Sequence, residues 1–361
     1  MLISIVAAVV VIAVLVLIHE LGHFTFAKLF NIKVLAFSLG FGPVLLKKKL
    51  GETEYRLSLL PLGGYVKMLG EDVEEPVEKI SESDNARSFV NQSNWKKFLV
   101  LFAGPFSNWL FAFLILWMVF IHGMPYIPTI VGDVKKNTPA FTAGIQKGDE
   151  ITAIDGVKTR NWEQMTKIIR SDRADREVTI DLTRNGKTVV VKLKPELESE
   201  KNMFGENMKI PVIGIMSSGE VRIRPLNAGS AFIPAANETW NITALVVFSL
   251  EKLVEGKVPA KDLGGPILIA QQAGRQAKKG VDALLFYAAL ISINFALLNI
   301  LPIPVLDGGN IMFTAIEAVI RRPLSKKVKL VALQFGLVFI VLLMVFAFYN
   351  DITRIIVSHH H

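Results

Sequence analysis

Long apolar runs separated by polar stretches dominate the chain. Four of these runs, at 2–27, 98–121, 283–305 and 330–349, reach the length of about 20 residues that a helix needs to cross a bilayer. A fifth apolar stretch, 242–250, is too short to span and indicates an interfacial or buried helix. The pattern therefore predicts a polytopic membrane protein with four transmembrane helices and long polar segments between them.

Between the first two apolar runs, the pattern changes from helical to extended. Residues 34–69 alternate apolar and polar positions on both sides of a Gly-Pro break, and Gly63 and Gly64 make a turn before Tyr65. This pattern predicts two or more short β-hairpins that associate with the membrane. An exposed edge of these hairpins could pair with an extended peptide, or the sheet could simply pack against the first helix. Both interpretations stay open.

The long segment between the second and third apolar runs begins with a small α+β pattern at 127–196. A Gly-Asp-x-Ile-x-x-Ile-Asp-Gly stretch at 148–156 leads to two strands, 178–183 and 188–193, which an Asn-Gly turn joins. This order resembles a PDZ domain, and PDZ folds bind chain ends or strands by β-augmentation. A spacer that only restricts access to the membrane part is the alternative interpretation.

The basic residues gather on two of the loops that separate the apolar runs. Lysines lie at 47–49 and 96–97, a second basic group lies at 321–329, and no Lys or Arg precedes the first run. By the positive-inside rule, both loops are cytoplasmic, whereas both termini and segment 122–282 are extracytoplasmic. The net charge of +8 is then mostly a topology signal, and no nucleic-acid partner is expected.

Two further features of composition narrow the chemistry. The chain has no cysteine, so no disulfide holds the exported part and no thiolate serves as ligand or nucleophile. Three histidines at 359–361 are typical of a purification-tag remnant, so they are excluded from the search for metal ligands.

The first apolar run lacks a basic start and a small-residue cleavage site, so we expect it to be retained rather than removed as a signal peptide.

A His-Glu-x-x-His run, from His19 through Glu20 to His23, lies near the end of the first apolar run. On a helix, His19 and His23 are four residues apart and share a face, so two imidazoles can bind one metal ion. Glu20 is then placed to handle a proton of water. A charge at membrane depth costs at least ~2.5 kcal/mol and usually marks a functional site. The alternative is a pair of interfacial histidines that cap a membrane helix.

A third protein ligand is needed to complete a catalytic zinc site, and the end of the third apolar run supplies Asp307. Pro302, Pro304 and two glycines surround this carboxylate, which predicts an unwound segment that turns Asp307 inward. In the predicted topology Asp307 and the histidine pair lie near the same, cytoplasmic side. The alternative is that Asp307 is only an interfacial helix cap.

The second apolar run contains small and polar residues at 103–108, including Gly104, Pro105 and Asn108. Close helix packing accounts for the small residues, and Asn108 can hydrogen-bond across helices at membrane depth. We expect a structural rather than a catalytic role for Asn108.

Taken with these motifs, the sequence resembles the site-2 protease family of intramembrane zinc metalloproteases, in the regulator-of-sigma-E subgroup but with a single PDZ domain. The likeness covers nearly the whole chain, and a Gly265-Pro266-Ile267 stretch adds to it. The resemblance implies that His19, His23 and Asp307 bind Zn²⁺ and that Glu20 is the catalytic base. Relatives can carry two PDZ domains and a histidine at position 310, where this chain has asparagine; neither departure affects the three ligands.

The resemblance also implies how a substrate is held. The substrate-binding residues that it implies are Asn294, Asn299, Pro302 and Pro304 beside Asp307, and Gly63, Gly64 and Tyr65 in the hairpin region. A substrate helix must unwind before its peptide bonds can react, and an edge strand could hold the extended segment.

The expected function is an intramembrane zinc metalloendopeptidase of the bacterial inner membrane. By resemblance, its substrates are single-span membrane proteins, either anti-sigma factors after a first extracytoplasmic cut or remnant signal peptides. The PDZ domain is expected to contact substrate chain ends or to filter by size. A non-enzymatic, membrane-anchored PDZ scaffold is the principal alternative, and a zinc transporter is disfavoured because the ionisable groups cluster at one depth.

The expected fold is a polytopic α-helical membrane protein with four transmembrane helices, a membrane-associated β-hairpin sheet and an inserted extracytoplasmic PDZ domain of α+β type. Its expected segments are the metal-motif helix at 1–30, hairpins at 31–70, an acidic linker at 71–97, the second span at 98–122, the PDZ domain at 127–196, an extracytoplasmic region with interfacial helices at 197–282, the third span with Asp307 at 283–309, a loop at 310–329, the fourth span at 330–350, and the tag remnant at 358–361.

Overall fold

The computed structural model describes residues 2–71, 81–171, 176–201, 207–257, 259 and 264–359. Its chain divides into two compact units, one formed by Met1–Val119 with Phe232–His361 and the other by Phe120–Ala231. The helices are α1 (Leu2–Leu29), α2 (Glu82–Asn85), the 3-10 helix η2 (Phe89–Asn91), α3 (Asn94–Gly123), α4 (Pro139–Thr142), α5 (Trp162–Arg170), α6 (Ala228–Val254), α7 (Pro266–Lys279), α8 (Val281–Ile300), α9 (Asp307–Ile320) and α10 (Lys326–His359). The strands are β1 (Val34–Leu50), β2 (Thr53–Met68), β3 (Met124–Tyr126), β4 (Val131–Val134), β5 (Glu150–Ile154), β6 (Val157–Lys158), β7 (Val178–Arg184), β8 (Lys187–Leu193), β9 (Glu196–Lys201), β10 (Asn207–Val212), β11 (Ile215–Ser217) and β12 (Arg222–Arg224).

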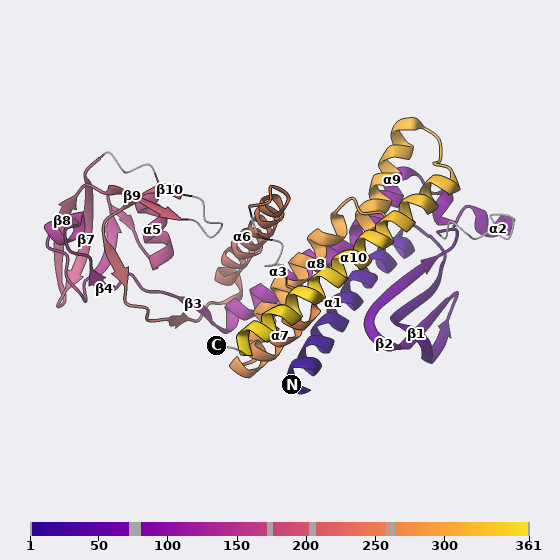
Figure 1. Ribbon diagram of the computed structural model, residues 1–361, viewed down its shortest axis with the longest axis horizontal. Coiled ribbons are helices and arrows are strands. Elements are labelled where there is room, and N and C mark those ends of the chain that lie inside the picture. Colours follow the sequence, from indigo (N-terminus) through magenta and orange to yellow (C-terminus); the bar gives the residue numbers. More distant parts are fainter. Residues whose placement is uncertain are drawn as a thin grey trace. The chain divides into compact units, whose positions relative to one another are not determined.

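Four helices in the described part of the chain are long and apolar enough to cross a membrane, and they coincide with the four predicted runs (Figure 1). They are α1, α3, α8 and α10. The fifth apolar stretch, 242–250, belongs to the longer helix α6, which is not one of the four. The chain is therefore built around apolar helices, as its hydropathy pattern predicts.

Small residues let the helices of this unit approach closely. A Cβ placed on Gly22 of α1 would overlap the carbonyl of Ala103 and the hydroxyl of Ser107 on α3. Near the start of α1, the Ser4 side chain would likewise overlap a Cβ placed on Gly274 of α7. Such contacts are the usual basis of helix association in lipid, where hydrophobic burial between helices contributes little. The expectation that the small residues of α3 serve helix packing agrees with this arrangement.

The third predicted span differs from the structure at its end. Helix α8 stops at Ile300, and Asp307 begins a separate helix, α9, which extends to Ile320 through most of the expected loop 310–329. Pro302 and Pro304 lack the N–H groups that would continue α8. Gly308 and Gly309 then allow α9 to start against the carbonyl groups of the preceding segment, where a Cβ would clash. Asp307 thus lies at the beginning of a helix and not at the end of one.

Residues 34–68 form one twice-folded sheet instead of several short hairpins. Residues 36–39 of β1 pair on one side with 54–57 and on the other with 64–67, while 46–50 pair with 53–57. The order across the sheet is therefore 64–68, 34–39, 53–58 and 44–50. The two outer pairs are antiparallel, whereas 36–39 and 54–57 run in the same direction. Gly40 makes the bend in β1 possible, because its φ is +93° and a Cβ would lie 2.8 Å from the Leu60 carbonyl oxygen. Figure 1 shows β1 and β2 beside α1.

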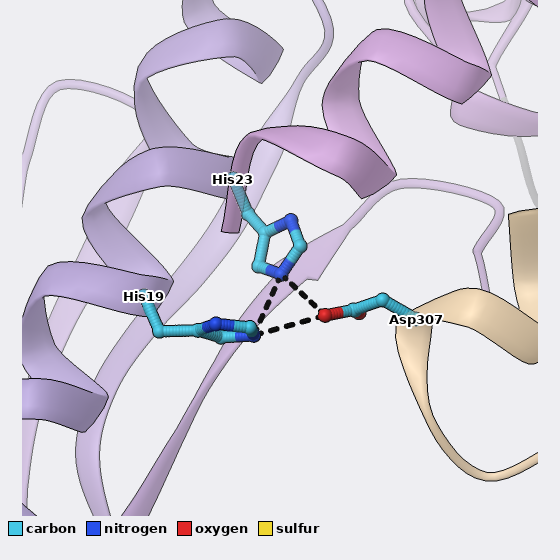
Figure 2. Close-up of side chains that lie close together, drawn as sticks. All are labelled: His19, His23 and Asp307. Atoms are coloured by element: carbon cyan, nitrogen blue, oxygen red, sulfur yellow. Dashed lines mark hydrogen bonds and ion pairs between the residues drawn. The ribbon is translucent and has the colours of Figure 1, made fainter. Parts of the chain in front are cut away.

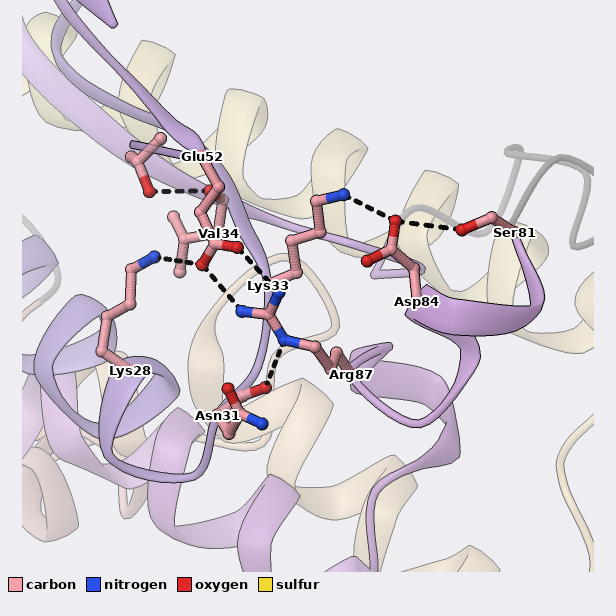
Figure 3. A network of polar contacts seen from close by, with 9 residues as sticks. Lys28, Asn31, Lys33, Val34, Glu52, Ser81, Asp84 and Arg87 are labelled. Atoms are coloured by element: carbon pink, nitrogen blue, oxygen red, sulfur yellow. Dashed lines mark hydrogen bonds and ion pairs between the residues drawn. The ribbon is translucent and has the colours of Figure 1, made fainter. Parts of the chain in front are cut away.

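A polar network ties the turn between β1 and β2 to the end of α1 (Figure 3). Both carboxylate oxygens of Glu52 accept hydrogen bonds from Arg87, at 2.8 Å, and Lys28 of α1 donates a third at 2.6 Å. The hydrogen bonds from Arg87, followed by that from Lys28, lower the pKa of Glu52 to about 2. Next to this turn, Thr53 donates to the Val34 carbonyl at 2.8 Å. Three sequence-distant segments are therefore held at one point.

The second unit is an α+β domain with its own core. Strands β6, β5, β7 and β8 form an antiparallel sheet in that order, and a buried apolar cluster fills the space beneath it. Ile213 belongs to this cluster, and β11 pairs with β4, so the packing extends beyond the expected boundary at 196. Strands β3 and β12 pair where the chain enters and leaves the domain.

The Gly-Asp pair that the sequence shares with PDZ domains has a structural role. Arg184 donates two hydrogen bonds to the buried carboxylate of Asp149, at 2.8 and 2.7 Å, and the backbone N–H of Gln146 donates a third. Burial alone would raise the pKa of Asp149, but these bonds outweigh it and hold the pKa below its usual range. The ion pair therefore fixes the loop before β5 against β7.

The Glu52 network predicts a local response to acid. Glu52 has a lowered folded-state pKa, so its contribution is complete above about pH 4.5 and is lost as the pH falls toward 2. Glu52→Gln should remove ~1 kcal/mol at neutral pH, the upper range for partly exposed ion pairs. Hydrogen exchange of residues 53–58 should accelerate about fivefold, and the difference from wild type should shrink at low pH.

Glu54→Gln is the matched control, because Glu54 pairs with Arg56 on its own strand and joins no separate segments. Equal exchange rates for both variants at pH 7 would contradict the anchoring role of Glu52.

Candidate metal centre

Two helices bring three potential metal ligands together in the membrane unit (Figure 2). His19 and His23 project from one face of α1, and Asp307 projects toward them from the first turn of α9. One oxygen of Asp307 lies 3.0 Å from Nε2 of His19 and 3.4 Å from Nε2 of His23, while the two nitrogens are 3.2 Å apart. Among the described residues, these three form the one group of histidines and acids close enough to hold a metal ion.

The spacing of the three atoms fits zinc. Ligands at zinc–nitrogen and zinc–oxygen distances of about 2 Å in a tetrahedral arrangement lie about 3.3 Å from one another. The observed separations of 3.0 to 3.4 Å match this value. Two imidazoles and one carboxylate are also the ligand types of catalytic zinc sites that keep a fourth position open.

The surroundings of His23 point its ligand atom at this cluster. Nδ1 of His23 lies 2.8 Å from the backbone carbonyl oxygen of Val100 on α3. A carbonyl only accepts hydrogen bonds, so the ring proton sits on Nδ1 and donates to it. Nε2 therefore carries a lone pair and is free to bind a cation. Sequence reasoning had no means to find Val100, because the contact comes from its backbone.

Helix α3 leaves room for the imidazoles at Gly104. A Cβ at this position would lie 2.9 Å from Cε1 of His19 and closer still to Nε2 of His23. The ring of Phe295 from α8 packs edge-on against His19, with centroids 5.5 Å apart. The glycine at membrane depth was a sequence signal for close packing, whereas nothing in the sequence indicated that the close neighbour is the histidine pair.

Glu20 follows His19 on α1 and lies between the histidine pair and the β-sheet. A Cβ at Gly64 would be 3.1 Å from Cγ of Glu20, and the Val66 backbone N–H is within hydrogen-bonding reach of the carboxylate. Glu20 is half-buried. The segment 64–68, which forms one edge of the sheet, therefore runs past the carboxylate that sequence reasoning identified as the base.

The other predicted substrate-binding residues lie at varying positions around the cluster. Asn294 is on α8 beside Phe295, and its amide donates to the Leu290 carbonyl of its own helix at 3.0 Å. Asn299 is in the last turn of α8 and is half-buried. Pro302, which is exposed, and Pro304 lie in the irregular segment before Asp307.

In the hairpin region, Gly64 approaches Glu20, whereas Gly63 and Tyr65 contact the opposite bend. A Cβ on Gly63 would overlap the ring of Phe41. Tyr65 stacks on Phe41, with centroids 6.2 Å apart, and accepts a hydrogen bond from Arg56 at 2.9 Å. Of the three, Gly64 is the one that the structure places beside the catalytic candidate.

A protein-family comparison matches residues 7–343 to Peptidase family M50. The chain belongs to this family. A Campylobacter jejuni protein that carries the name zinc metalloprotease is 36% identical over 97% of this chain and 93% of that protein. An Agrobacterium fabrum protein named in the same way is 34% identical, over 98% of this chain and 96% of its own length. The protease RseP of Yersinia pestis is 28% identical over 98% of this chain and 99% of its own length.

Among solved structures, the chain is similar to the PDZ domain of an SdrC-like protein from Listeria monocytogenes. The identity is 26%, the TM-score is 0.21, and the match covers 26% of this chain and 88% of that domain.

Membership in the family confirms three expectations. The chain is an intramembrane zinc metalloprotease, its cofactor is Zn²⁺, and the resemblance to site-2 proteases is correct. The non-enzymatic scaffold is not favoured, because relatives matching over nearly the whole chain carry the names of proteases.

The close approach at Gly104 predicts that Gly104→Ala will displace the imidazoles. We expect zinc affinity to fall ~10-fold or more, as for other changes that disturb ligand orientation. Metal content of the purified protein in graded chelator, measured by mass spectrometry, tests this. Gly229→Ala on α6 is the control, because its added Cβ would meet only the Asn227 side chain at 3.6 Å. Unchanged zinc affinity in Gly104→Ala would refute the crowding argument.

Proposed function

We propose that His19, His23 and Asp307 hold the zinc ion and that Glu20 is the general base of peptide-bond hydrolysis. The observation that supports this best is the convergence of two Nε2 atoms and one carboxylate oxygen within 3.4 Å, from two different helices. When bound there, zinc supplies Lewis acidity toward the scissile carbonyl and lowers the pKa of a water molecule.

Glu20 performs the proton transfers in this proposal. Its carboxylate sits one residue from a zinc ligand and beside the sheet edge where a substrate would lie. It takes a proton from the attacking water and delivers it to the leaving amine, so that the same group serves as base and then as acid. Its half-buried position limits competing solvent without closing the site.

Residues 64–68 hold the substrate as an added strand. Among the described strands, this segment pairs on one side only, with 34–39, so its other edge is open to β-augmentation. Gly64 keeps the backbone close to Glu20, since any side chain there would meet Cγ of Glu20 and the Ser38 carbonyl. Gly63 and Tyr65 support the edge through the bend that packs on Phe41.

The break between α8 and α9 holds the other side of the substrate. Asn294 and Asn299 carry amides that can pair with backbone groups of an unwinding helix, and Pro302 and Pro304 keep this segment irregular up to Asp307. Non-helical backbone at membrane depth is tolerated only where protein or a cavity covers it. A substrate strand lying in this position is such a cover.

The proposed substrates are single-span membrane proteins, either anti-sigma factors shortened outside the membrane or remnant signal peptides. By the positive-inside rule, the basic residues at 47–49 and 321–329 favour a cytoplasmic position for the segments that follow α1 and α9. Both termini and the α+β domain are then extracytoplasmic, and the metal centre lies near the cytoplasmic side of the inner membrane.

The α+β domain is proposed to be a PDZ domain that restricts access to the membrane part. It contains a cavity of about 900 Å³ between α5 and β3, lined by residues such as Tyr126, Trp162 and Arg170. A chain end could enter this cavity, while a folded extracytoplasmic domain could not. The chain passes directly from α3 into β3, so no linker separates this domain from the end of that helix in the sequence.

Glu20→Gln should separate chemistry from metal binding. We expect zinc content to stay at the wild-type level while cleavage of a reconstituted single-span substrate falls by about 10²–10⁴-fold. His23→Ala and Asp307→Ala should lose both zinc and cleavage. Cleavage at the wild-type rate in Glu20→Gln would refute its role, and full zinc content in both ligand variants would refute the metal site.

Removing the α+β domain should widen substrate access. Tyr126 and Arg222 pair across β3 and β12, so residues 128–220 can be replaced by a short Gly-Ser turn without pulling the membrane unit apart. The shortened protein should cleave full-length substrate that the intact protein refuses, and should cleave pre-shortened substrate as before. Continued refusal of the full-length substrate, with normal cleavage of the shortened one, would count against the filter.

A further inference from the structure

Asn108 is a buried polar residue that the proposed function leaves without a role. It lies on α3 with no exposed surface, and its amide oxygen Oδ1 has no hydrogen-bond partner among the described residues. Its amide nitrogen lies 3.4 Å from Nδ1 of His19. The Ser292 hydroxyl on α8 donates to the Asn108 backbone carbonyl at 2.7 Å and holds this part of α3 against α8.

The two histidines differ in what faces Nδ1. His23 faces the Val100 carbonyl, which only accepts and therefore keeps the ring proton on Nδ1. His19 faces an amide, which can donate through nitrogen or accept through oxygen. With the nitrogen toward it, Nδ1 of His19 is an acceptor and the ring proton sits on Nε2, pointing at Asp307 at 3.0 Å. That tautomer cannot bind a metal through Nε2.

A half-turn of the amide exchanges its oxygen and nitrogen within nearly the same volume. Oδ1 then accepts the Nδ1 proton of His19, and Nε2 is left with the lone pair that a zinc ligand needs. The same rotation gives the unpartnered buried oxygen a donor. The Asn108 oxygen and the Nδ1 proton of His19 are then paired with each other, and the amide nitrogen takes the position that has no partner among the described residues.

We propose that Asn108 is a positioning residue that sets the tautomer of His19, and that its amide oxygen holds the Nδ1 proton whenever zinc is bound. This inference rests on the proposed function, because it requires His19 to be a zinc ligand. Gly104 and Asn108, one turn apart on α3, then both serve the histidine pair. Gly104 leaves space for the two imidazoles, and Asn108 binds Nδ1 of His19.

Removing the acceptor leaves a buried N–H of the zinc-bound His19 without a partner, which disfavours the metal-bound form. Losing the hydrogen bond to the ring nitrogen that does not bind the metal typically weakens metal affinity 10–100-fold. An aspartate at this position also accepts the Nδ1 proton and adds a negative charge near the cation. Loss of the acceptor should therefore weaken zinc binding, whereas the aspartate should not.

The test measures zinc affinity by chelator competition on the full-length protein in detergent, in a Glu20→Gln background so that proteolysis plays no part. Asn108→Leu should bind zinc 10–100-fold more weakly than its parent. Asn108→Asp should bind at least as tightly as the parent, yet its metal-free form should melt at a lower temperature because a buried carboxylate then lacks a cation. Thr243→Val, which removes the hydrogen bond from Trp109 of α3 to α6, is the control and should leave zinc affinity unchanged.

Equal zinc affinity for Asn108→Leu and the parent would overturn the inference, as would equal losses in the Leu and Asp variants. If Asn108→Leu does not fold, Asn108→Ala replaces it with the same expectation, since it removes the acceptor without adding bulk. The proposed function fails by a different result, namely a parent protein that binds no zinc or an Asp307→Ala variant that retains it.

Discussion

Three polar side chains brought together among apolar helices are the constraint on which the rest of the membrane unit depends. Two imidazoles and a carboxylate at this depth are costly unless a cation or hydrogen bonds compensate them. The structure provides hydrogen-bond partners for the rings and a spacing of the three atoms that fits a cation. The Nε2 atoms and the carboxylate oxygen converge at zinc-ligand spacing, and the outer nitrogens of the rings face the Val100 carbonyl and the Asn108 amide.

The helices around the centre are shaped by this requirement. Gly22 and Gly104 bring α1 and α3 close enough for Val100 and Asn108 to reach the histidines. The proline-containing break between α8 and α9 gives Asp307 a position at a helix start, where a carboxylate is also favoured by the helix dipole. Small residues and a broken helix thus serve the geometry of the three candidate ligand atoms as much as the packing itself.

The folded sheet of β1 and β2 connects this centre to the polar end of α1. Its edge segment 64–68 passes Glu20, and its far turn is fixed by Glu52 to Lys28 and Arg87. A sheet that ion pairs fix at one turn and that stays open along the 64–68 edge has the geometry that the proposed substrate strand requires. The α+β domain has a separate core and a buried ion pair of its own.

The sequence by itself determined the features that follow from local spacing. Apolar runs long enough to cross a bilayer as helices predicted the four candidate spans. The interval of four residues placed His19 and His23 on one face of a helix. Pro302, Pro304 and the following glycines predicted an interruption before Asp307. Tertiary structure decided what depends on contacts between distant segments. The double pairing of residues 36–39, the inclusion of Ile213 in the domain core, the approach of Gly64 to Glu20 and the carbonyl of Val100 on His23 all involve partners far apart in the chain. Such partners leave no periodic trace, because backbone groups are the same in every residue and a register is chosen by the packing of whole segments.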